Sequence, residues 1–509
     1  MNPDYSLLIP EYLLAALAAL VVALDLFVGR RVRDYLPYLT ASGLGIILVV
    51  SLLYVNDTPK DFGGLIQIDN FTTFFRVFFI AITAVVALAS AHFVRGHLRH
   101  AGEYYGLLVL STIGAIYMAA ARELLTAYIS LELLSFSLYV LVSFAKMDAK
   151  SNEGGMKYML LGAFSSALFL YGMSLIYGVA GSTFYSDIAA AFRAGTADFD
   201  LAMLMGLVLV VAGLGFKVAA VPFHMWTPDA YEGAPLPITA YLSAASKAAG
   251  FALLLRLFAG AFLPVLEDWQ WMVAALAAAS MTVGNLVAIQ QHNIKRLLAY
   301  SSIVQVGFML MAIAALSPET ASALVLHMTG YVITNLAAFA VIIAYYNLSG
   351  KDEIPDYRGL AERAPFLALS LTVALFSLAG MPLFAGFATK FILFQAVAKE
   401  GFLWLAALAV VNSFVSLYYY LLVIRQMYVG EPEETGRLRV PLVANAVVLA
   451  LVVGIFIVGL FPQPLFDAAD NATGAVFPQA VERIQDTGSP PSPPPPGGGW
   501  ISSPDLQYR

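Results

Sequence analysis

The sequence predicts an all-α polytopic membrane protein with about fourteen transmembrane helices. Of its 509 residues, 60% are hydrophobic and only 12% are charged, and the mean hydropathy is +0.79. A soluble chain of this length needs far more polar surface to cover its core. Runs of about 20 apolar residues, the length that crosses a bilayer as a helix, recur along most of the chain.

The apolar runs divide the chain into five parts. We expect three helices in 1–100, a five-helix unit in 101–265, a second five-helix unit in 266–430 and a last helix in 431–465. The proline-rich remainder, 466–509, is predicted to be a disordered tail. The predicted spans are 8–28, 36–55, 71–94, 105–121, 124–145, 156–180, 201–222, 237–260, 271–289, 296–315, 321–346, 366–397, 402–427 and 440–461.

The basic residues predict how the chain is oriented. Connections after odd-numbered spans hold most of the loop lysines and arginines, whereas those after even-numbered spans hold four, Lys60, Arg122, Arg193 and Lys399. By the positive-inside rule the odd connections are cytoplasmic. An even number of spans then places both termini on the outer, periplasmic side of a bacterial inner membrane.

Three lysines lie inside long apolar stretches. Lys247 is near the middle of a stretch without an evident break, whereas Lys217 and Lys390 lie close to Pro222 and Pro382. A lysine at the centre of a spanning helix costs roughly 2.5 to 3.5 kcal/mol on insertion scales, so such residues usually have a function. The three lysines are therefore the first candidates for the working site.

The two proline-associated lysines suggest an internal repeat. Gly-Leu-Gly-Phe-Lys217 precedes Pro222 in the seventh span, and Gly-Phe-Ala-Thr-Lys390 follows Pro382 in the twelfth. An odd separation makes the two copies run in opposite directions, as in transporters with inverted repeats and broken helices. We therefore expect helices 4–8 and 9–13 to be related units, with helices 7 and 12 interrupted.

Glu132 is the acidic residue that the sequence places most deeply in a span. A buried carboxylate is most readily neutralised by a lysine on an adjacent helix, and Lys217 is the expected partner. Movement of Glu132 relative to Lys217 would change how tightly the lysine holds its proton. The alternative is a static salt bridge that fixes helix packing.

Four other polar residues carry weaker signals. His224, after the Pro222 break, is equally consistent with a proton relay and with a local cap. His327, in the middle of the eleventh span, is interpreted as a relay, with a satisfied core histidine as the alternative. Arg76 and Arg256 are expected near helix ends, where long side chains can reach the interface.

Composition also excludes several classes of chemistry. The chain has no cysteine, which removes disulfides, thiolate metal sites and iron–sulfur ligation. No glycine-rich loop opens a helix after a strand, so we expect no cofactor and no metal in this chain. A net charge of −6 gives no indication of a nucleic-acid partner.

Two long motifs resemble a known family. The segments PFHMWTPDAYEGAP (222–235) and IKRLLAYSSIVQVG (294–307) are similar to the antiporter-like, proton-conducting membrane subunits of respiratory complex I and of Mrp-type antiporters. LELLSFSLYVLV, EGGMKYMLLGAFSSALFLYG and a lysine on the twelfth span most resemble the N-type subunit of NADH-quinone oxidoreductase. The resemblance implies that Glu132 and Lys217 form a modulating pair, that Lys247 is a central relay and that Lys390 faces the outer exit.

The resemblance also implies a function and partners. The chain would move protons outward, coupled to quinone reduction in other subunits that hold NADH, FMN, iron–sulfur clusters and quinone. M-type and K-type membrane-arm subunits and the lipid bilayer are the implied neighbours. Two alternatives stay open, an Mrp-type cation/proton antiporter subunit and a non-conducting structural scaffold.

Overall fold

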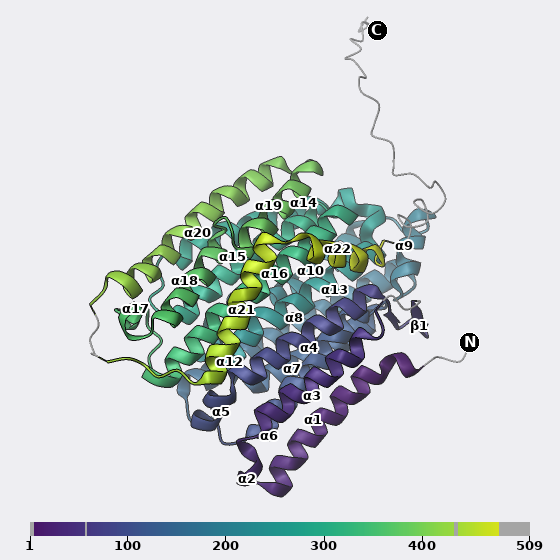
Figure 1. Cartoon of the computed structure of the whole chain (residues 1–509). Coiled ribbons are helices and arrows are strands. Elements are labelled where there is room, and N and C mark those ends of the chain that lie inside the picture. The colour runs from purple at the N-terminus through teal and green to yellow at the C-terminus, as the bar shows by residue number, and fades with distance from the viewer. Residues whose placement is uncertain (1–4, 56–58, 432–435, 478–509) are drawn as a thin grey trace, which may run out of the picture.

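The computed structural model describes residues 5–55, 59–431 and 436–477, and most of them are helical (Figure 1). This confirms the predicted all-α fold. A short antiparallel hairpin is an addition that the sequence did not predict. It pairs β1 with β2 so that Lys60 lies opposite Ile68.

The first hundred residues form helices around this hairpin. Their elements are η1 (Tyr5–Leu8), α1 (Ile9–Val28), α2 (Arg30–Arg33), α3 (Leu36–Leu52), β1 (Lys60–Phe62), β2 (Ile66–Ile68), α4 (Asn70–Ala89) and α5 (Ala91–His97).

The next segment contains the helices of the first predicted unit. They are α6 (Ala101–Ala120), α7 (Leu124–Val142), α8 (Ala149–Ala180), α9 (Tyr185–Arg193), α10 (Leu201–Val218), α11 (Trp226–Gly233), α12 (Leu236–Tyr241), the π-helix η2 (Leu242–Ser246), α13 (Lys247–Leu257), the π-helix η3 (Phe258–Phe262) and η4 (Leu263–Val265).

The remaining described elements complete the bundle. They are α14 (Leu266–Ala288), α15 (Ile294–Ala314), α16 (Pro318–Ser349), η5 (Ile354–Tyr357), α17 (Leu360–Arg363), α18 (Pro365–Ala379), α19 (Ala385–Lys399), α20 (Leu403–Val429), α21 (Leu442–Leu460) and α22 (Gln463–Gly474).

Each predicted span coincides with helix, but the number of crossings stays a prediction. Within the described residues, 11 helices are long and apolar enough to cross a membrane, and α3 and α18 are shorter apolar helices. One of the eleven is the continuous helical stretch Leu236–Ala288, where the sequence predicts two spans. The 3-10 turn η4, which contains Pro264, marks the point at which those two spans would meet.

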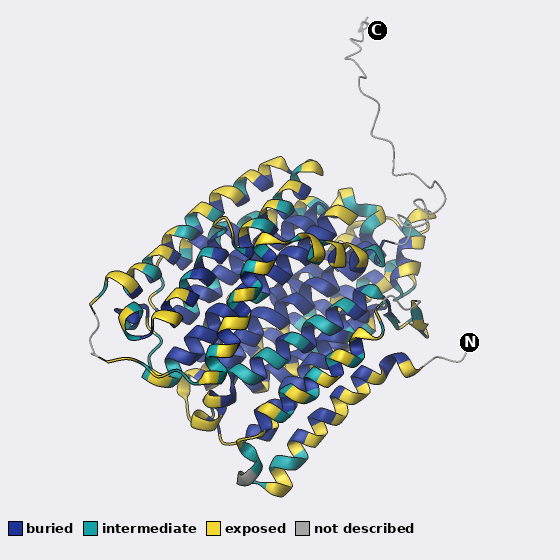
Figure 2. Cartoon of the chain, viewed as in Figure 1, coloured by how far each residue is buried: buried dark blue, intermediate teal, exposed yellow. Residues whose placement is uncertain are grey.

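Burial separates a central group of helices from an outer layer. Figure 2 shows α15 and α16 largely buried, whereas α1, α20 and α21 carry exposed residues along their outer faces. Many of these exposed residues are large and apolar, such as Leu20, Phe414 and Ile457. An apolar exterior is what a hydrocarbon solvent requires.

The helix breaks expected near Pro222 and Pro382 are present. α10 ends at Ala219, which has a left-handed φ of 66°, and α18 ends at Gly380, with φ of 87°. Helix ends leave carbonyl and amide groups without intrahelical partners, and lipid cannot supply them. Here the indole of Trp226 donates to the Phe216 carbonyl at 2.9 Å, and the Val221 amide donates to Ser280 Oγ at 2.9 Å.

The helix that carries Lys247 is continuous, as expected, but it contains a π-turn. The π-helix η2 directly precedes Lys247 within the unbroken helical stretch Leu236–Ala288. A π-turn loosens the backbone ladder and is common at functional sites. The Ser243 carbonyl within η2 accepts a hydrogen bond from the Tyr331 hydroxyl at 3.0 Å, and Asn335 Nδ2 donates to Ser243 Oγ at 2.5 Å.

The predicted start of the disordered tail, at residue 466, is too early. Its first residues belong to α22, which turns away from α21 (Figure 1) and packs on α16 and α4. Ser322 Oγ on α16 lies 2.9 Å from Asp470 Oδ1 and 2.7 Å from Thr473 Oγ1. The helix is short and half polar, so hydropathy gave no signal for it. The rest of the predicted tail, 478–509, lies outside the described residues.

Two arginines are buried rather than directed to the interface. Arg76 is fully buried, and its Nε lies 2.7 Å from Glu11 Oε1. Arg256 is 4% exposed and donates to both carboxylate oxygens of Asp69, at 2.6 and 2.9 Å. The expected snorkelling is therefore wrong, because each side chain has a carboxylate partner from a distant segment. Asp69 also caps α4 through the Thr72 amide, so its pair with Arg256 fixes α4 against α13.

We predict that Arg256→Met destabilises the protein strongly. Removing one partner of a buried pair leaves an uncompensated charge and costs about 3 to 5 kcal/mol. The double variant Arg256→Met/Asp69→Asn should recover part of the loss, because asparagine can still cap α4. Arg193→Gln, at an exposed position of α9, is the control. Thermal unfolding in detergent measures the effect, and an Arg256→Met midpoint equal to wild type would contradict it.

Candidate functional site

Lys217 lies in the last turn of α10, next to the helix break. Its side chain is 2% exposed, and Nζ donates to Ser135 Oγ on α7 at 2.9 Å. Ser135 in turn donates to the Leu131 carbonyl at 2.7 Å. The ammonium group is therefore held by a hydroxyl on the same helix that carries Glu132.

Glu132 does not form the expected ion pair with Lys217. It accepts a short hydrogen bond from Ser166 Oγ on α8, although it lies within electrostatic reach of Lys217. It is partly exposed, while Glu11 is the more deeply buried acid at 2%. A cavity of about 10 Å³ is lined by Lys217 and by Ser135 and Ser166, the hydroxyl partners of Lys217 and Glu132. That space is about the size of one water-sized probe.

Lys247 begins α13 and is 1% exposed. Its Nζ donates to Ser302 Oγ on α15 at 2.6 Å and lies 5.8 Å from the centre of the Tyr231 ring. One turn later, a Cβ placed on Gly250 would lie 3.6 Å from Lys217 Cγ. The Lys217 and Lys247 helices therefore contact each other.

Lys390 lies on α19, beyond the second helix break. Its Nζ donates to the Leu378 carbonyl at 2.7 Å and to Ser413 Oγ at 3.0 Å, and it lies 4.9 Å from the centre of the Phe308 ring. Leu378 belongs to the last turn of α18, whose carbonyls lack intrahelical partners. The break thus supplies a backbone acceptor for the buried ammonium group.

The two histidines occupy different surroundings. His327 on α16 is 1% exposed, its Nδ1 lies 3.0 Å from Thr389 Oγ1, and its Nε2 has no hydrogen-bond partner among the described residues. His327 is therefore next to Lys390. His224 lies in the α10–α11 break, and its carbonyl accepts from the Thr227 amide at 2.9 Å. That contact is typical of a turn. The Nδ1 atom of His224 also has no hydrogen-bond partner among the described residues.

The structure adds a polar link that sequence reasoning missed. Ser302 and Gln305 are three residues apart on α15 and share one face. Ser302 accepts from Lys247, while Gln305 Nε2 donates to the Leu378 carbonyl at 3.3 Å, the same oxygen that Lys390 contacts. α15 thus connects the surroundings of two lysines. The only available signal was two polar residues at helical spacing in an apolar span, which is common in membrane helices.

An ionic cluster holds the segment between α10 and α12. Arg296 Nη1 contacts Asp229 at 2.8 Å and Glu232 at 3.0 Å, Lys157 contacts Asp229 at 2.7 Å, and Lys150 contacts Glu232 at 2.9 Å. Partial burial alone would raise the pKa of the Asp229 carboxyl, but hydrogen bonds from Lys157 and Arg296 hold that pKa below its ordinary value. The cluster joins α8, α11 and α15.

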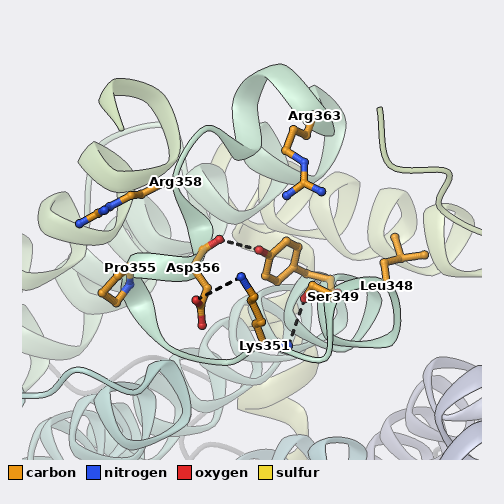
Figure 3. A pocket seen from close by; sticks show the side chains of 8 residues that line it. Leu348, Ser349, Lys351, Pro355, Asp356, Arg358 and Arg363 are labelled. Atoms are coloured by element: carbon orange, nitrogen blue, oxygen red, sulfur yellow. Dashed lines mark hydrogen bonds and ion pairs between the residues drawn. The ribbon is translucent and has the colours of Figure 1, made fainter. Parts of the chain in front are cut away.

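A second group of charges lies at the end of α16. Figure 3 shows Lys351 directed toward Asp356, with Arg358 and Arg363 on either side. The Tyr345 hydroxyl donates to the Asp356 carbonyl at 2.5 Å. In the residues that the structure describes, no group of three or more His, Asp or Glu side chains could hold a metal ion.

Comparison with known proteins agrees with this architecture. The sequence model of the NADH:quinone oxidoreductase/Mrp antiporter transmembrane family matches residues 121–416. NADH-quinone oxidoreductase subunit N of Moorella thermoacetica is 44% identical over 473 residues, which cover 92% of this chain and 98% of that protein.

Solved structures show the same fold. A chain of respiratory complex I from Thermus thermophilus aligns with a TM-score of 0.76 at 32% identity, covering 91% of this chain and 100% of that one. A chain of the Mrp complex from Dietzia sp. aligns with a TM-score of 0.78 at 23% identity, covering 93% and 99%, and supports the fold alone.

The helical bundle with buried lysines defines an antiporter-like membrane subunit, and the chain belongs to the NADH:quinone oxidoreductase/Mrp antiporter transmembrane family. The predicted assignment to subunit N of NADH-quinone oxidoreductase, part of a proton-translocating oxidoreductase, is confirmed by these relatives. The Mrp-type alternative is less well supported.

Proposed function

We propose that this chain moves protons outward through a buried track formed by Glu132, Lys217, Lys247 and Lys390, with His224 and His327 as relays. The observation that carries the proposal is that Lys217, Lys247 and Lys390 are each held by neutral groups and by no carboxylate at ion-pair distance, within the described residues. A neutral hydroxyl or carbonyl accepts a hydrogen bond without fixing a positive charge, so the lysine can lose its proton.

Glu132 controls the first step of this track. Its carboxylate is held by Ser166 on α8, and Ser166 lines the same small cavity as Lys217. Displacement of Glu132 toward Lys217 would favour the protonated lysine, and its return to Ser166 would favour release. The observed arrangement is the separated one, which argues against a static salt bridge.

Transfer from Lys217 to Lys390 uses the contacts between helices. The Lys217 and Lys247 helices touch at Gly250, and α15 links Lys247 to the Leu378 carbonyl beside Lys390 through Ser302 and Gln305. His327 lies next to Lys390, through Thr389, and one turn later on α16 Tyr331 contacts Ser243 in the segment that precedes Lys247. We therefore assign His327 to the step between Lys247 and Lys390.

The energy for transport comes from other subunits. Moving one proton outward against 100 mV requires about 2.3 kcal/mol. The chain has no cysteine for iron–sulfur clusters, and we propose that NADH, FMN, the clusters and quinone are bound by the rest of the complex. We also propose that 101–265 and 266–430 are inverted five-helix units.

The position of Glu132 favours a protein neighbour on one side of the molecule. Along α7, Ile129 and Phe136 are 60% and 62% exposed, and Glu132 lies one turn from each. A carboxylate beside such a stripe would be costly to expose to lipid tails. We propose that a K-type or M-type subunit covers this face of α7 and α8.

The distribution of basic segments supports an orientation. The segments with Arg99, Lys146 and Lys295 lie together at one end of the bundle, whereas Arg122 lies beside Asp61 in the hairpin. We propose that the first end is cytoplasmic and that both termini are periplasmic in a bacterial inner membrane.

Replacing Lys247 tests the track directly. Lys247→Arg should lose proton transport almost as completely as Lys247→Ala, because a guanidinium is effectively never deprotonated in proteins. Lys150→Arg, at an exposed ion pair, is the matched control and should pump normally. Proton uptake per NADH oxidised in inverted vesicles measures the effect. Wild-type coupling in Lys247→Arg would show that Lys247 provides only a fixed charge.

Cysteine labelling tests the orientation without background, since the native chain has no cysteine. Ser349→Cys should react with membrane-impermeant maleimide only from the cytoplasmic side, and Thr196→Cys only from outside. Ser349 is the last residue of α16, and Thr196 follows α9. A reversed pattern at either position would refute the proposed topology.

Cross-linking tests the covered face. In the assembled complex, Phe136→Cys should form a covalent adduct with another membrane-arm subunit when a short bifunctional reagent is added. Ile46→Cys on α3, 66% exposed, reports background reaction at a comparably exposed apolar position. Equal yields at the two positions, or labelling of Phe136→Cys by lipid-soluble probes alone, would contradict a protein neighbour at Glu132.

A further inference from the structure

A cavity of about 420 Å³ lies at the end of the bundle where the basic segments meet. It is formed by α5 and the turn after it, the segment that follows α7, the α11–α12 junction, and the ends of α15 and α16. Small-molecule sites typically measure roughly 300 to 1,000 Å³. The cavity is therefore large enough for a ligand, and none of the proposed proton-track residues lines it.

Two positive charges at this cavity are not neutralised. Arg99 and Lys146 are exposed, and neither side chain makes a hydrogen bond or ion pair within the described part of the chain. Lys295 also lines the cavity but is paired with Asp352 at 2.9 Å. The carboxylate of Asp148 accepts from the Lys150 amide at 2.9 Å and caps α8. The cavity rim thus carries available positive charge.

The inner wall of the same cavity is apolar. Phe93, Phe144 and Leu236 are 6%, 8% and 2% exposed and line it together with Tyr346. His97 stacks on Phe93 with 4.6 Å between ring centroids. Phe144, Leu236 and Tyr346 lie at or near helix ends, which the proposed topology places where a membrane changes from hydrocarbon to headgroup. A cationic rim over an apolar wall fits a ligand that is anionic at one end and apolar at the other.

We propose that this cavity binds an anionic phospholipid. Its phosphate diester would lie between Arg99 and Lys146, and its glycerol and first acyl carbons would pack against Phe144 and Leu236. Basic pockets between helices at a membrane surface bind acidic headgroups in this way. The inference concerns a separate site and does not depend on the proposed proton path.

The smaller pocket of Figure 3 lacks these properties. It measures about 90 Å³, and its Lys351 is already paired with Asp356 at 3.9 Å. The two basic sites therefore differ in size and in available charge. Of the two, only the larger has unpaired cations, room for a ligand and a deep apolar wall.

The test measures phospholipid retained by the assembled complex. Complexes with the wild-type chain, with Arg99→Gln/Lys146→Gln and with Ala145→Trp are purified, washed in detergent and analysed by mass spectrometry. Ala145 lines the cavity, so tryptophan fills the space without changing charge. Arg425→Gln is the matched control, because Arg425 is exposed, lies on α20 and has no side-chain partner among the described residues.

We expect the double variant to bind phosphatidylglycerol roughly 30-fold more weakly when it is added back in vesicles, since each surface cation contributes about a fivefold gain for anionic lipid. Ala145→Trp should lose the retained lipid, and Arg425→Gln should keep it. Equal retention in all variants would overturn the proposal. So would retention of inorganic phosphate without lipid, loss of zwitterionic and anionic lipids alike, or a cross-link from Met147→Cys to a neighbouring protein instead of to lipid.

Discussion

A buried ammonium group needs hydrogen-bond acceptors that lipid cannot provide, and the interior of this protein is organised around that requirement. A regular α-helix offers none, because its carbonyls are already occupied. Lys390 uses a carbonyl that the end of α18 leaves open, while Lys217 and Lys247 use serine hydroxyls of neighbouring helices. Of the two helix breaks, the one after α18 supplies an acceptor to a buried lysine, whereas Ser280 and Trp226 satisfy backbone groups at the break after α10.

Charges in this protein are neutralised in two distinct ways. Arg76 is paired with Glu11, which joins α4 to α1, and Arg256 is paired with Asp69, which joins α13 to the start of α4. Such pairs cannot easily exchange protons, because the guanidinium keeps its charge. The lysines are instead held by uncharged oxygens. The arginine pairs therefore hold fixed charges, whereas neutral partners do not fix a charge on the lysines.

Much of the fold follows from sequence because its signals are local. Apolar runs predict the helices, and Pro222 and Pro382 predict the two breaks. Other features depend on contacts between distant residues, and no local pattern reveals them. Arg256 and Asp69 are 187 residues apart in the chain, and Glu132 finds Ser166 only after α7 and α8 pack together. The candidate lysines could be chosen by the cost of burying them, but their hydrogen-bond partners could not, because serine is frequent in membrane helices.

The π-helix before Lys247 ties function to chain length at one position. Because an α-helix turns by about 100° per residue, one additional residue would rotate everything that follows it, and a π-turn absorbs such a residue within a single turn. If Leu242–Ser246 kept its five residues but adopted a regular α-helical ladder, Lys247 would rotate away from Ser302. The hydropathy profile and the number of spans would not reveal the difference. In an alignment of related chains, a single-residue gap here would therefore show where the π-turn has been lost, although it would look like neutral variation in helix length.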